Sequence, residues 1–248
     1  MKIILSPAKK MVTDTDSIAP VGMPNFLDKT TEILSWMKGL EKDKLKAIWK
    51  CNDKIARQNF ERLENMDLYH MLTPAILSYE GIAFQYMAPA VFEYGQFEYI
   101  QKHLRILSAF YGSLKPLDGV RPYRLEMQAK ISVDGRKDLY DFWGMALAES
   151  LETDCILNLA SKEYSQAVSK HLDRSVRWIN FVFGEIKNEK VVEKGTLCKM
   201  ARGEMVRYLA EKQIEDIEEV KHFDRLDFRY STEHSKEDTF VYIRNEER

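Results

Sequence analysis

"HLRILSAFYGSLKPLDGVRPYRLEM" (residues 103–127) changes character halfway along and indicates the kind of fold. Residues 104–109 have the apolar character of a buried strand. The rest is an irregular, Pro- and Gly-containing loop that carries Asp118, Arg121, Arg124 and Glu126. Functional sites collect where strands end and loops begin. The stretch therefore predicts a sheet with a polar site at the end of this strand.

Two other apolar segments end in the same way. "KIILS" (residues 2–6) is a short strand that stops at a Ser-Pro turn, because the residue before proline avoids the helical region. "CILNLAS" (residues 155–161) is a buried strand that ends in a polar turn. Apolar periodicity predicts helices at residues 25–38 (ended by Gly39), 43–63, 95–104, 137–151, 162–172 and 196–211, the last capped by Thr196.

The C-terminal half adds strands of another kind. Residues 175–188 alternate apolar and polar side chains as one long strand, and residues 190–195 fit its hairpin partner. Residues 240–243 suggest a last edge strand. Single strands, hairpins and helices together predict an α+β (mixed α/β) fold. We expect a single compact domain over residues 1–248, with a central mixed sheet flanked by helices.

Composition limits the function classes. The chain has 248 residues, of which 45% are hydrophobic and 31% charged, enough to bury a large core. The net charge is −2 and the pI is near 6.3. No global field attracts nucleic acid or an acidic membrane, so a basic site must come from local clustering.

Several classes of site are not indicated. Cys51, Cys155 and Cys198 are far apart and form no C-x-x-C pair, which fits a reducing cytoplasm better than a disulfide framework. The histidines are isolated, so no metal site is predicted. No phosphate-binding glycine fingerprint is present, and no cofactor is predicted. No segment is long and apolar enough for a signal peptide or a membrane span, so we expect a cytoplasmic protein.

The first strand end carries Ser6 and Lys9 in an S-x-x-K string. In other folds this string marks a serine nucleophile beside a lysine base. Here it follows a strand and does not open a helix, which favours a turn whose lysine is available to an anion. Ser6 is kept as a candidate catalytic residue, and Lys9 as an anion-binding one.

The loop after residue 109 is rich in arginine. Arginine binds phosphate or carboxylate through two parallel hydrogen bonds, and a neighbouring Asp or Glu can hold its guanidinium in place. The alternative is a structural ion-pair network that fixes a long loop. Both interpretations stay open at this stage.

The third strand end is followed by Asn158, Ser161, Glu163 and Tyr164. Helix capping alone would explain Ser161. Asn158 lies within an apolar run, and a buried amide needs hydrogen-bond partners, which a ligand could supply at the mouth of a cleft.

Two helical segments have a basic face. Lys199, Arg202, Gly203 and Arg207 fall within about 140° on a helical wheel. Glycine there costs roughly 1 kcal/mol of helix propensity, which is understandable if another backbone or a phosphate approaches closely. The other face comprises Lys46, Lys50, Lys54 and Arg57, within roughly 80° if the segment is one unbroken helix. Asn52 and Asp53 could instead begin a second helix. A solvated face is the alternative in both cases.

Taken together, the segments resemble the YaaA family of bacterial peroxide-stress proteins. The resemblance rests on "LSPAKKM", "NDKIARQN", "HLRILSAFYGSLKPLDGVRPYRLEM", "DLYDFWG", "NLASKEY", "KMARGEMVRY" and "DTFVYIR", in order over nearly the whole chain. It implies a protein that lowers peroxide damage, limits free intracellular iron and binds DNA through a positively charged cleft and a helix-hairpin-helix element. The expected DNA is duplex or single-stranded, with weak sequence preference.

The resemblance also places these features on the chain. It puts the helix-hairpin-helix-like segment at about residues 36–59. The basic residues that it assigns to the cleft are Lys9, Lys54, Arg57, Arg105, Arg121, Arg124, Lys199 and Arg202. Direct iron sequestration is the weakest hypothesis, because no iron-ligand spacing is present.

The strand-end motifs support a second hypothesis, because they are richer than phosphate binding requires. We expect them to converge on one pocket, whose further residues are Ser108, Asp118, Tyr123, Asn158, Ser161 and Tyr164. Such a pocket suits an enzyme acting on a nucleobase or nucleoside, with a nucleotide-like small molecule as ligand. The candidate catalytic residues are Glu126, Glu163, Ser6 and Tyr111.

Overall fold

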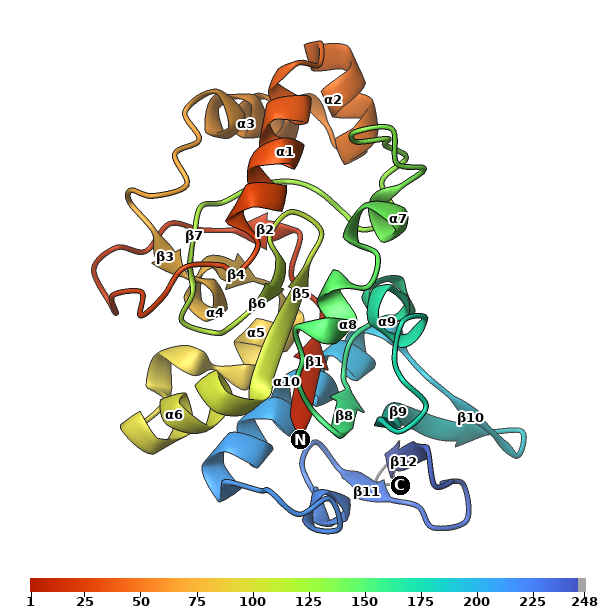
Figure 1. Ribbon diagram of the computed structural model, residues 1–248. Helices are drawn as coiled ribbons and strands as arrows, with labels where there is room; N and C mark the ends of the chain where they lie inside the picture. The colour runs from red at the N-terminus through yellow and green to blue at the C-terminus, as the bar shows by residue number, and fades with distance from the viewer. Residues whose placement is uncertain (245–248) are drawn as a thin grey trace.

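The computed structural model of the protein describes residues 1–244. Its centre is an eight-stranded sheet with strand order β11-β12-β9-β8-β1-β5-β6, in which β10 also pairs with β9 (Figure 1). The strands of this sheet are β1 (Lys2–Leu5), β5 (Leu104–Ser108), β6 (Gly112–Leu114), β8 (Cys155–Asn158), β9 (Arg177–Lys187), β10 (Lys190–Val192), β11 (Phe228–Tyr230) and β12 (Thr239–Arg244). Two short pairs lie outside it, namely β2 (Lys10–Met11) with β4 (Tyr79–Glu80) and β3 (Thr73–Pro74) with β7 (Gly119–Val120).

The middle of the sheet is parallel and buried. β1 lies between β5 and β8 and pairs with both in parallel, so that Ile3 lies beside Leu104 on one side and Leu157 on the other. All three side chains are fully buried. Strands covered on both faces have continuous apolar runs, as these do. β6 and β11 pair antiparallel at the two edges. The expected mixed α/β fold is confirmed.

Helices cover the sheet. Helices also form the region beyond the carboxyl end of β1, at the top of the view (Figure 1). The helices are α1 (Leu27–Lys38), α2 (Lys42–Trp49), α3 (Asp53–Glu64), α4 (Ala75–Ser78), α5 (Ile82–Met87), α6 (Tyr94–His103), α7 (Leu139–Trp143), α8 (Ala146–Glu149), α9 (Lys162–Ser169) and α10 (Gly195–Lys212), with 3-10 turns η1 (Pro89–Val91) and η2 (Glu219–His222). Gly39 ends α1 as predicted.

Three details of the sequence interpretation were wrong. The helix predicted at residues 137–151 is broken at Gly144, whose positive φ of 49° separates α7 from α8. β12 is an inner strand between β9 and β11, because the short strand β11 forms the edge beyond it. Thr196 does not cap α10, which begins one residue earlier at Gly195.

The basic segment after residue 41 forms two helices. Lys50 has a left-handed backbone with φ 45°, which ends α2. Asn52 then caps α3, since its side-chain oxygen accepts a hydrogen bond from the Ile55 N–H at 3.0 Å. Lys46 and Lys54 therefore lie on different helices, and Lys46 is paired with Asp53. The helix-hairpin-helix function of the segment at about residues 36–59 stays a prediction.

A close approach of aromatic rings fixes the turn after β5. Gly112 has φ +78°, and a Cβ atom there would lie 2.9 Å from both the Phe26 and the Trp143 rings. The Trp143 Nε1–H donates to the Ala109 carbonyl at 3.1 Å. Only glycine combines this backbone conformation with the missing side chain, so the turn holds α1 and α7 against the end of β5.

Asp118 is a buried carboxylate in the loop that follows β6. Its Oδ2 accepts the Lys115 N–H at 2.8 Å. Burial raises the pKa of its carboxyl to about 6, against the opposing charges of Lys115 and Arg105. Asp118 therefore stabilises the turn through a hydrogen bond and destabilises the fold by its buried charge.

This carboxyl predicts a pH-dependent stability. The native state holds the Asp118 proton more tightly than the unfolded chain, so stability from this group is complete below about pH 4 and is lost as the pH rises through about 6. Chemical unfolding of the wild type and Asp118→Asn between pH 4 and 7 measures the effect. Relative to the variant, we expect the wild type to lose on the order of 2 kcal/mol. Parallel pH curves for the two proteins would contradict this.

Candidate functional site

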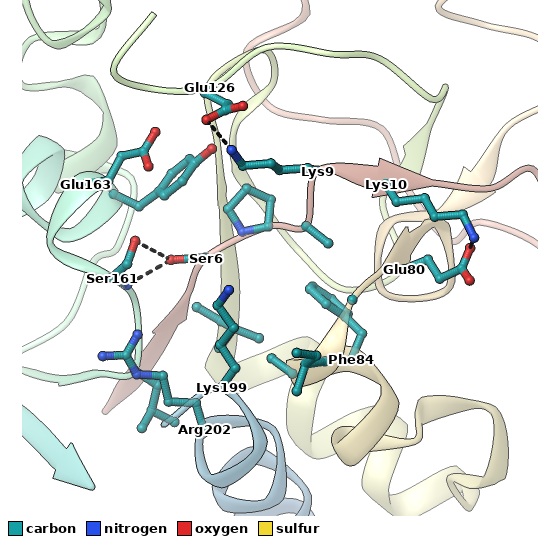
Figure 2. Close-up of a pocket in the computed structure, with 18 of the residues that line it drawn as sticks. Ser6, Lys9, Lys10, Glu80, Phe84, Glu126, Ser161, Glu163, Lys199 and Arg202 are labelled. Atoms are coloured by element: carbon teal, nitrogen blue, oxygen red, sulfur yellow. Dashed lines mark hydrogen bonds and ion pairs between the residues drawn. The ribbon is translucent and has the colours of Figure 1, made fainter. Parts of the chain in front are cut away.

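A cavity of about 530 Å³ opens at the carboxyl ends of β1 and β8 (Figure 2). Residues 5–10 follow β1 along one wall, residues 80–84 lead into α5, and residues 123–126 cross above. β1 lies between β5 and β8, and the chain reaches these two strands by separate crossovers. Open α/β sheets form their ligand crevice at such a position, outside the carboxyl ends of the strands. The size of the cavity suits a small-molecule site.

Ser6 and Ser161 join the ends of β1 and β8. The Ser161 N–H donates to Ser6 Oγ at 2.8 Å, and the Ser6 hydroxyl donates to Ser161 Oγ at 3.1 Å. Ser161 occupies the N-cap position of α9, but its side chain makes no capping hydrogen bond. Capping therefore does not explain Ser161. Its own hydroxyl proton remains available to the cavity.

One end of the cavity holds a cluster of opposite charges. Lys9 Nζ lies 2.8 Å from Glu126 Oε2, and Arg124 Nη2 lies 3.4 Å from Glu126 Oε1. Arg124 also donates to the carbonyls of Lys9 at 3.3 Å and Trp49 at 3.5 Å. The carboxylate neutralises part of the positive charge, and Arg124 connects the cavity to the end of α2.

Glu163 lines the same end of the cavity from the first turn of α9. One carboxylate oxygen accepts the Gln128 N–H at 3.2 Å. The Glu163 carbonyl accepts from the Tyr140 hydroxyl at 2.9 Å, which fixes the backbone. A half-buried carboxylate held in this way can accept a hydrogen bond or a proton from a ligand.

α10 supplies the other end of the cavity through Lys199 and Arg202. Neither side chain forms an ion pair with any residue in the described range 1–244. The next residue, Gly203, allows α10 to pack directly on α5, because a Cβ atom there would lie 2.0 Å from the Ala83 carbonyl oxygen. Glycine is therefore required at position 203 because the backbones of α5 and α10 come into contact there.

Tyrosines form the wall behind the charged cluster. The Tyr123 hydroxyl bonds to Ser108 Oγ at 2.7 Å and to the Tyr79 hydroxyl at 3.0 Å. Burial raises the pKa of Tyr123 to about 12 and also raises the pKa of Tyr164. These phenols are therefore neutral at physiological pH and act as hydrogen-bonding walls, not as bases.

The family of the chain follows from comparison with known proteins. The model of the family described as "Peroxide stress protein YaaA" matches residues 1–234. A UPF0246 protein of Agathobacter rectalis is 58% identical over 98% of this chain and 99% of its own length. UPF0246 proteins of Lachnoclostridium phytofermentans and Desulfitobacterium hafniense are 56% and 50% identical over 99% and 98% of this chain, and over 97% and 98% of their own lengths. The chain belongs to the YaaA family of peroxide stress proteins. The resemblance inferred from the motifs is confirmed, and with it a general role in peroxide stress.

In this YaaA-family protein, many of the predicted site residues lie on one cavity. The ones that line it are Ser6, Lys9, Tyr123, Arg124, Glu126, Ser161, Glu163, Tyr164, Lys199 and Arg202. They come from the segment after β1, the loop after β7, the turn after β8, α9 and α10. The parallel arrangement of β1 and β8 brings their polar carboxyl ends together.

Other predicted residues lie away from the cavity lining. Ser108 is buried behind Tyr123, and the Tyr111 hydroxyl is used by the Arg121 backbone at 3.0 Å. Asp118 is bonded to its own turn. Asn158 bonds to Asn180 at 3.0 Å and to the Ala160 N–H at 3.1 Å, so protein groups meet its hydrogen-bonding needs.

The remaining predicted cations do not line the cavity. Arg105 is near the amino end of β5, where it donates to the Gln101 and Leu104 carbonyls. Arg121 donates to the carbonyls of His70 and Met71. Lys54 and Arg57 are exposed on α3. The family resemblance had assigned all of these to one cleft.

The sequence interpretation missed the α5 wall of the cavity. This wall includes Glu80, Gly81 and Phe84, from a segment whose structure the sequence left ambiguous. Glu80 pairs with Lys10 at 2.8 Å across the short β2–β4 pair. Gly81 lies against Ala8, where a Cβ atom would be 2.9 Å from the Ala8 side chain. A glycine directly before an apolar run was the available signal.

Two features of other protein classes are absent from the described residues 1–244. Within residues 1–244, no helix has the length and apolar character needed to cross a membrane. In the same range, no group of three or more His, Cys, Asp or Glu side chains is arranged to hold a metal ion. Burial raises the pKa of the Cys198 thiol to about 12, so this cysteine is a weak nucleophile.

Proposed function

We propose that this YaaA-family protein acts in the cytoplasm during peroxide stress by binding DNA, and that it thereby helps to limit oxidative damage and free intracellular iron. The proposed surface begins at Lys199 and Arg202, continues past Arg124 and reaches α2 and α3. The observation that carries the proposal is the Arg124 contact with the Trp49 carbonyl, 3.5 Å long, which joins the cavity to these basic helices.

Charges on this surface favour phosphate contacts. Lys54 and Arg57 are exposed and form no ion pair with other residues in the described part of the chain. Unpaired Lys and Arg side chains release counterions when they bind a nucleic-acid backbone, and this release provides affinity without sequence preference. The net charge of −2 makes such local clustering the basis of any DNA affinity.

A salt series tests DNA binding. Affinity for fluorescent duplex and single-stranded DNA is measured at several salt concentrations, with wild type and Lys54→Ala/Arg57→Ala. We expect the double variant to bind more weakly and the slope of log K against log salt to fall by about 1 to 2. The matched control is Lys187→Ala/Lys190→Ala, which removes two exposed lysines from the β9–β10 hairpin on the far side of the molecule (Figure 1). Absent or salt-independent DNA binding by the wild type would contradict the proposal.

A second candidate function uses the cavity as an active site for a nucleobase or nucleoside. The observation in its favour is Glu163, a half-buried carboxylate that faces the cavity and accepts only the Gln128 N–H among described hydrogen bonds. As a general acid or base, Glu163 would be essential for turnover and dispensable for binding. We therefore expect Glu163→Gln to abolish turnover of a nucleoside substrate while binding persists. Unchanged turnover in this variant would exclude the assigned role.

A further inference from the structure

The two ends of the cavity differ in charge (Figure 2). At the α10 end, Lys199 and Arg202 are cations without an ion-pair partner in residues 1–244. At the opposite end, Glu126 pairs with Lys9 at 2.8 Å and with Arg124 at 3.4 Å, and Glu163 adds a second carboxylate. A ligand that fits both ends has a negative charge at one end and neutral hydrogen-bonding groups at the other.

Arg202 provides the most specific indication of a ligand. Its Nε is buried and has no hydrogen-bond partner in the described protein. A buried, charged donor without an acceptor is unfavourable, and the guanidinium lines the cavity. A phosphate offers the acceptor geometry that a guanidinium prefers. The Arg124 Nε is also buried without a partner, but Arg124 is less suitable for this role, because its two Nη groups already contact a carboxylate and two carbonyls.

The middle of the cavity suits a planar ring attached to a polar sugar. Phe84, Tyr164 and Leu159 contribute apolar surface to its walls. Ser6 and Ser161 lie between the two charged ends (Figure 2). Because Ser6 already donates its proton to Ser161 Oγ at 3.1 Å, the Ser161 hydroxyl is a donor for a ligand oxygen.

We propose that the cavity binds a nucleoside monophosphate group in one orientation. The phosphate lies against Lys199 and Arg202, and the ring packs along the apolar wall. The hydrogen-bonding edge of the base faces Glu126 and Glu163. The reverse orientation would place the phosphate beside Glu126 and Glu163, which repel it, while Lys9 and Arg124 at that end are already paired with Glu126. This site deepens the proposed function. Where the nucleotide is part of a DNA strand, the site rests on the proposed DNA binding.

Calorimetric binding at physiological salt tests the inference. The probes are the four deoxynucleoside monophosphates, the four matching nucleosides and inorganic phosphate. We expect at least one monophosphate to bind about tenfold or more tightly than its nucleoside and than phosphate. Arg202→Gln is expected to weaken monophosphate binding about 10- to 100-fold and to leave nucleoside binding nearly unchanged, because only the phosphate contact is lost.

The matched control is Arg174→Gln, which removes the same charge from an exposed loop before β9. It is expected to bind like the wild type. Thermal unfolding establishes that Arg202→Gln is folded. Lys199→Gln is a second test of the α10 end of the cavity, at a side chain that is more exposed than Arg202. Equal affinity for monophosphates and nucleosides would overturn the inference, and so would an Arg202→Gln variant that keeps the wild-type preference.

Two further measurements distinguish a DNA strand from a free nucleotide as the source of the ligand. Displacement of a bound monophosphate by a single-stranded oligonucleotide supports the site and identifies a strand as the source. A monophosphate that stays bound in the presence of the oligonucleotide also supports the site, and it identifies the free nucleotide as the ligand. Protein that binds monophosphates but no DNA contradicts the proposed DNA binding alone. Protein that binds DNA but no monophosphate overturns this inference alone.

Discussion

Gly203→Ala is expected to lower the free energy of unfolding by at least about 3 kcal/mol, or to prevent folding. The added Cβ atom would lie 2.0 Å from the Ala83 carbonyl oxygen, 2.8 Å from its carbon and 3.0 Å from the Met87 nitrogen. All three are backbone atoms of the α5 segment, so no side chain can rotate away. α5 and α10 would have to separate, and both helices carry walls of the cavity.

Gly195→Ala is the matched control for this prediction. Gly195 is the first residue of the same helix, and a Cβ atom there would meet no atom within 4 Å. Alanine in a helix is ordinarily favoured over glycine by roughly 0.5–1 kcal/mol, so the control is expected to be neutral or slightly stabilised. Urea unfolding of both variants measures the difference. Similar stabilities for the two variants would show that α5 and α10 do not touch at Gly203.

Ser108→Ala is expected to destabilise the protein by about 2–4 kcal/mol. Ser108 Oγ accepts the N–H groups of Phe110 at 3.1 Å and Tyr111 at 2.8 Å. With both lone pairs used, its hydroxyl donates to the Tyr123 hydroxyl, which in turn bonds to Tyr79. Removing one oxygen atom therefore leaves two buried N–H groups without an acceptor, and the buried Tyr123 phenol keeps only its bond to Tyr79.

Ser113→Ala, in the neighbouring strand β6, is the control for Ser108→Ala. The Ser113 hydroxyl is equally buried but has no hydrogen-bond partner in the described protein. Its removal is expected to be neutral or stabilising. Thermal unfolding compares stability, and near-ultraviolet circular dichroism reports the tyrosine environment, which only Ser108→Ala should change. Equal destabilisation by both variants would show that Ser108 acts through packing and not through its hydrogen bonds.

The sequence predicted the strands of the site better than its loops. β1, β5 and β8 were predictable because strands buried on both faces have unbroken apolar runs. Their parallel pairing then explains why Ser6 and Ser161, 155 positions apart in the chain, lie within hydrogen-bonding distance. The polar residues at the ends of β1 and β8 were a local signal for a site formed by distant segments.

The roles of individual charged side chains were less predictable. Arg105 and Arg124 look alike in the sequence, yet Arg105 lies near the amino end of β5 and Arg124 contacts Glu126 in the cavity. The difference depends on their positions relative to the ends of the sheet, which no local pattern contains. Asn158 was ambiguous for the same reason, because its partner Asn180 lies on a neighbouring strand.

The cavity has a consequence for how the protein is made. Its walls come from positions as far apart as Leu5 and Arg202, and β1, which is synthesised before β5 and β8, is completed only by pairing with them. At translation rates of about 5–20 residues per second, the ribosome needs roughly 10–40 s to proceed from β1 to α10. During that interval the apolar strand β1 has no complete sheet to join. A growing chain therefore gains the complete site only after α10 has been made, and β1 needs protection from aggregation until its partner strands are present.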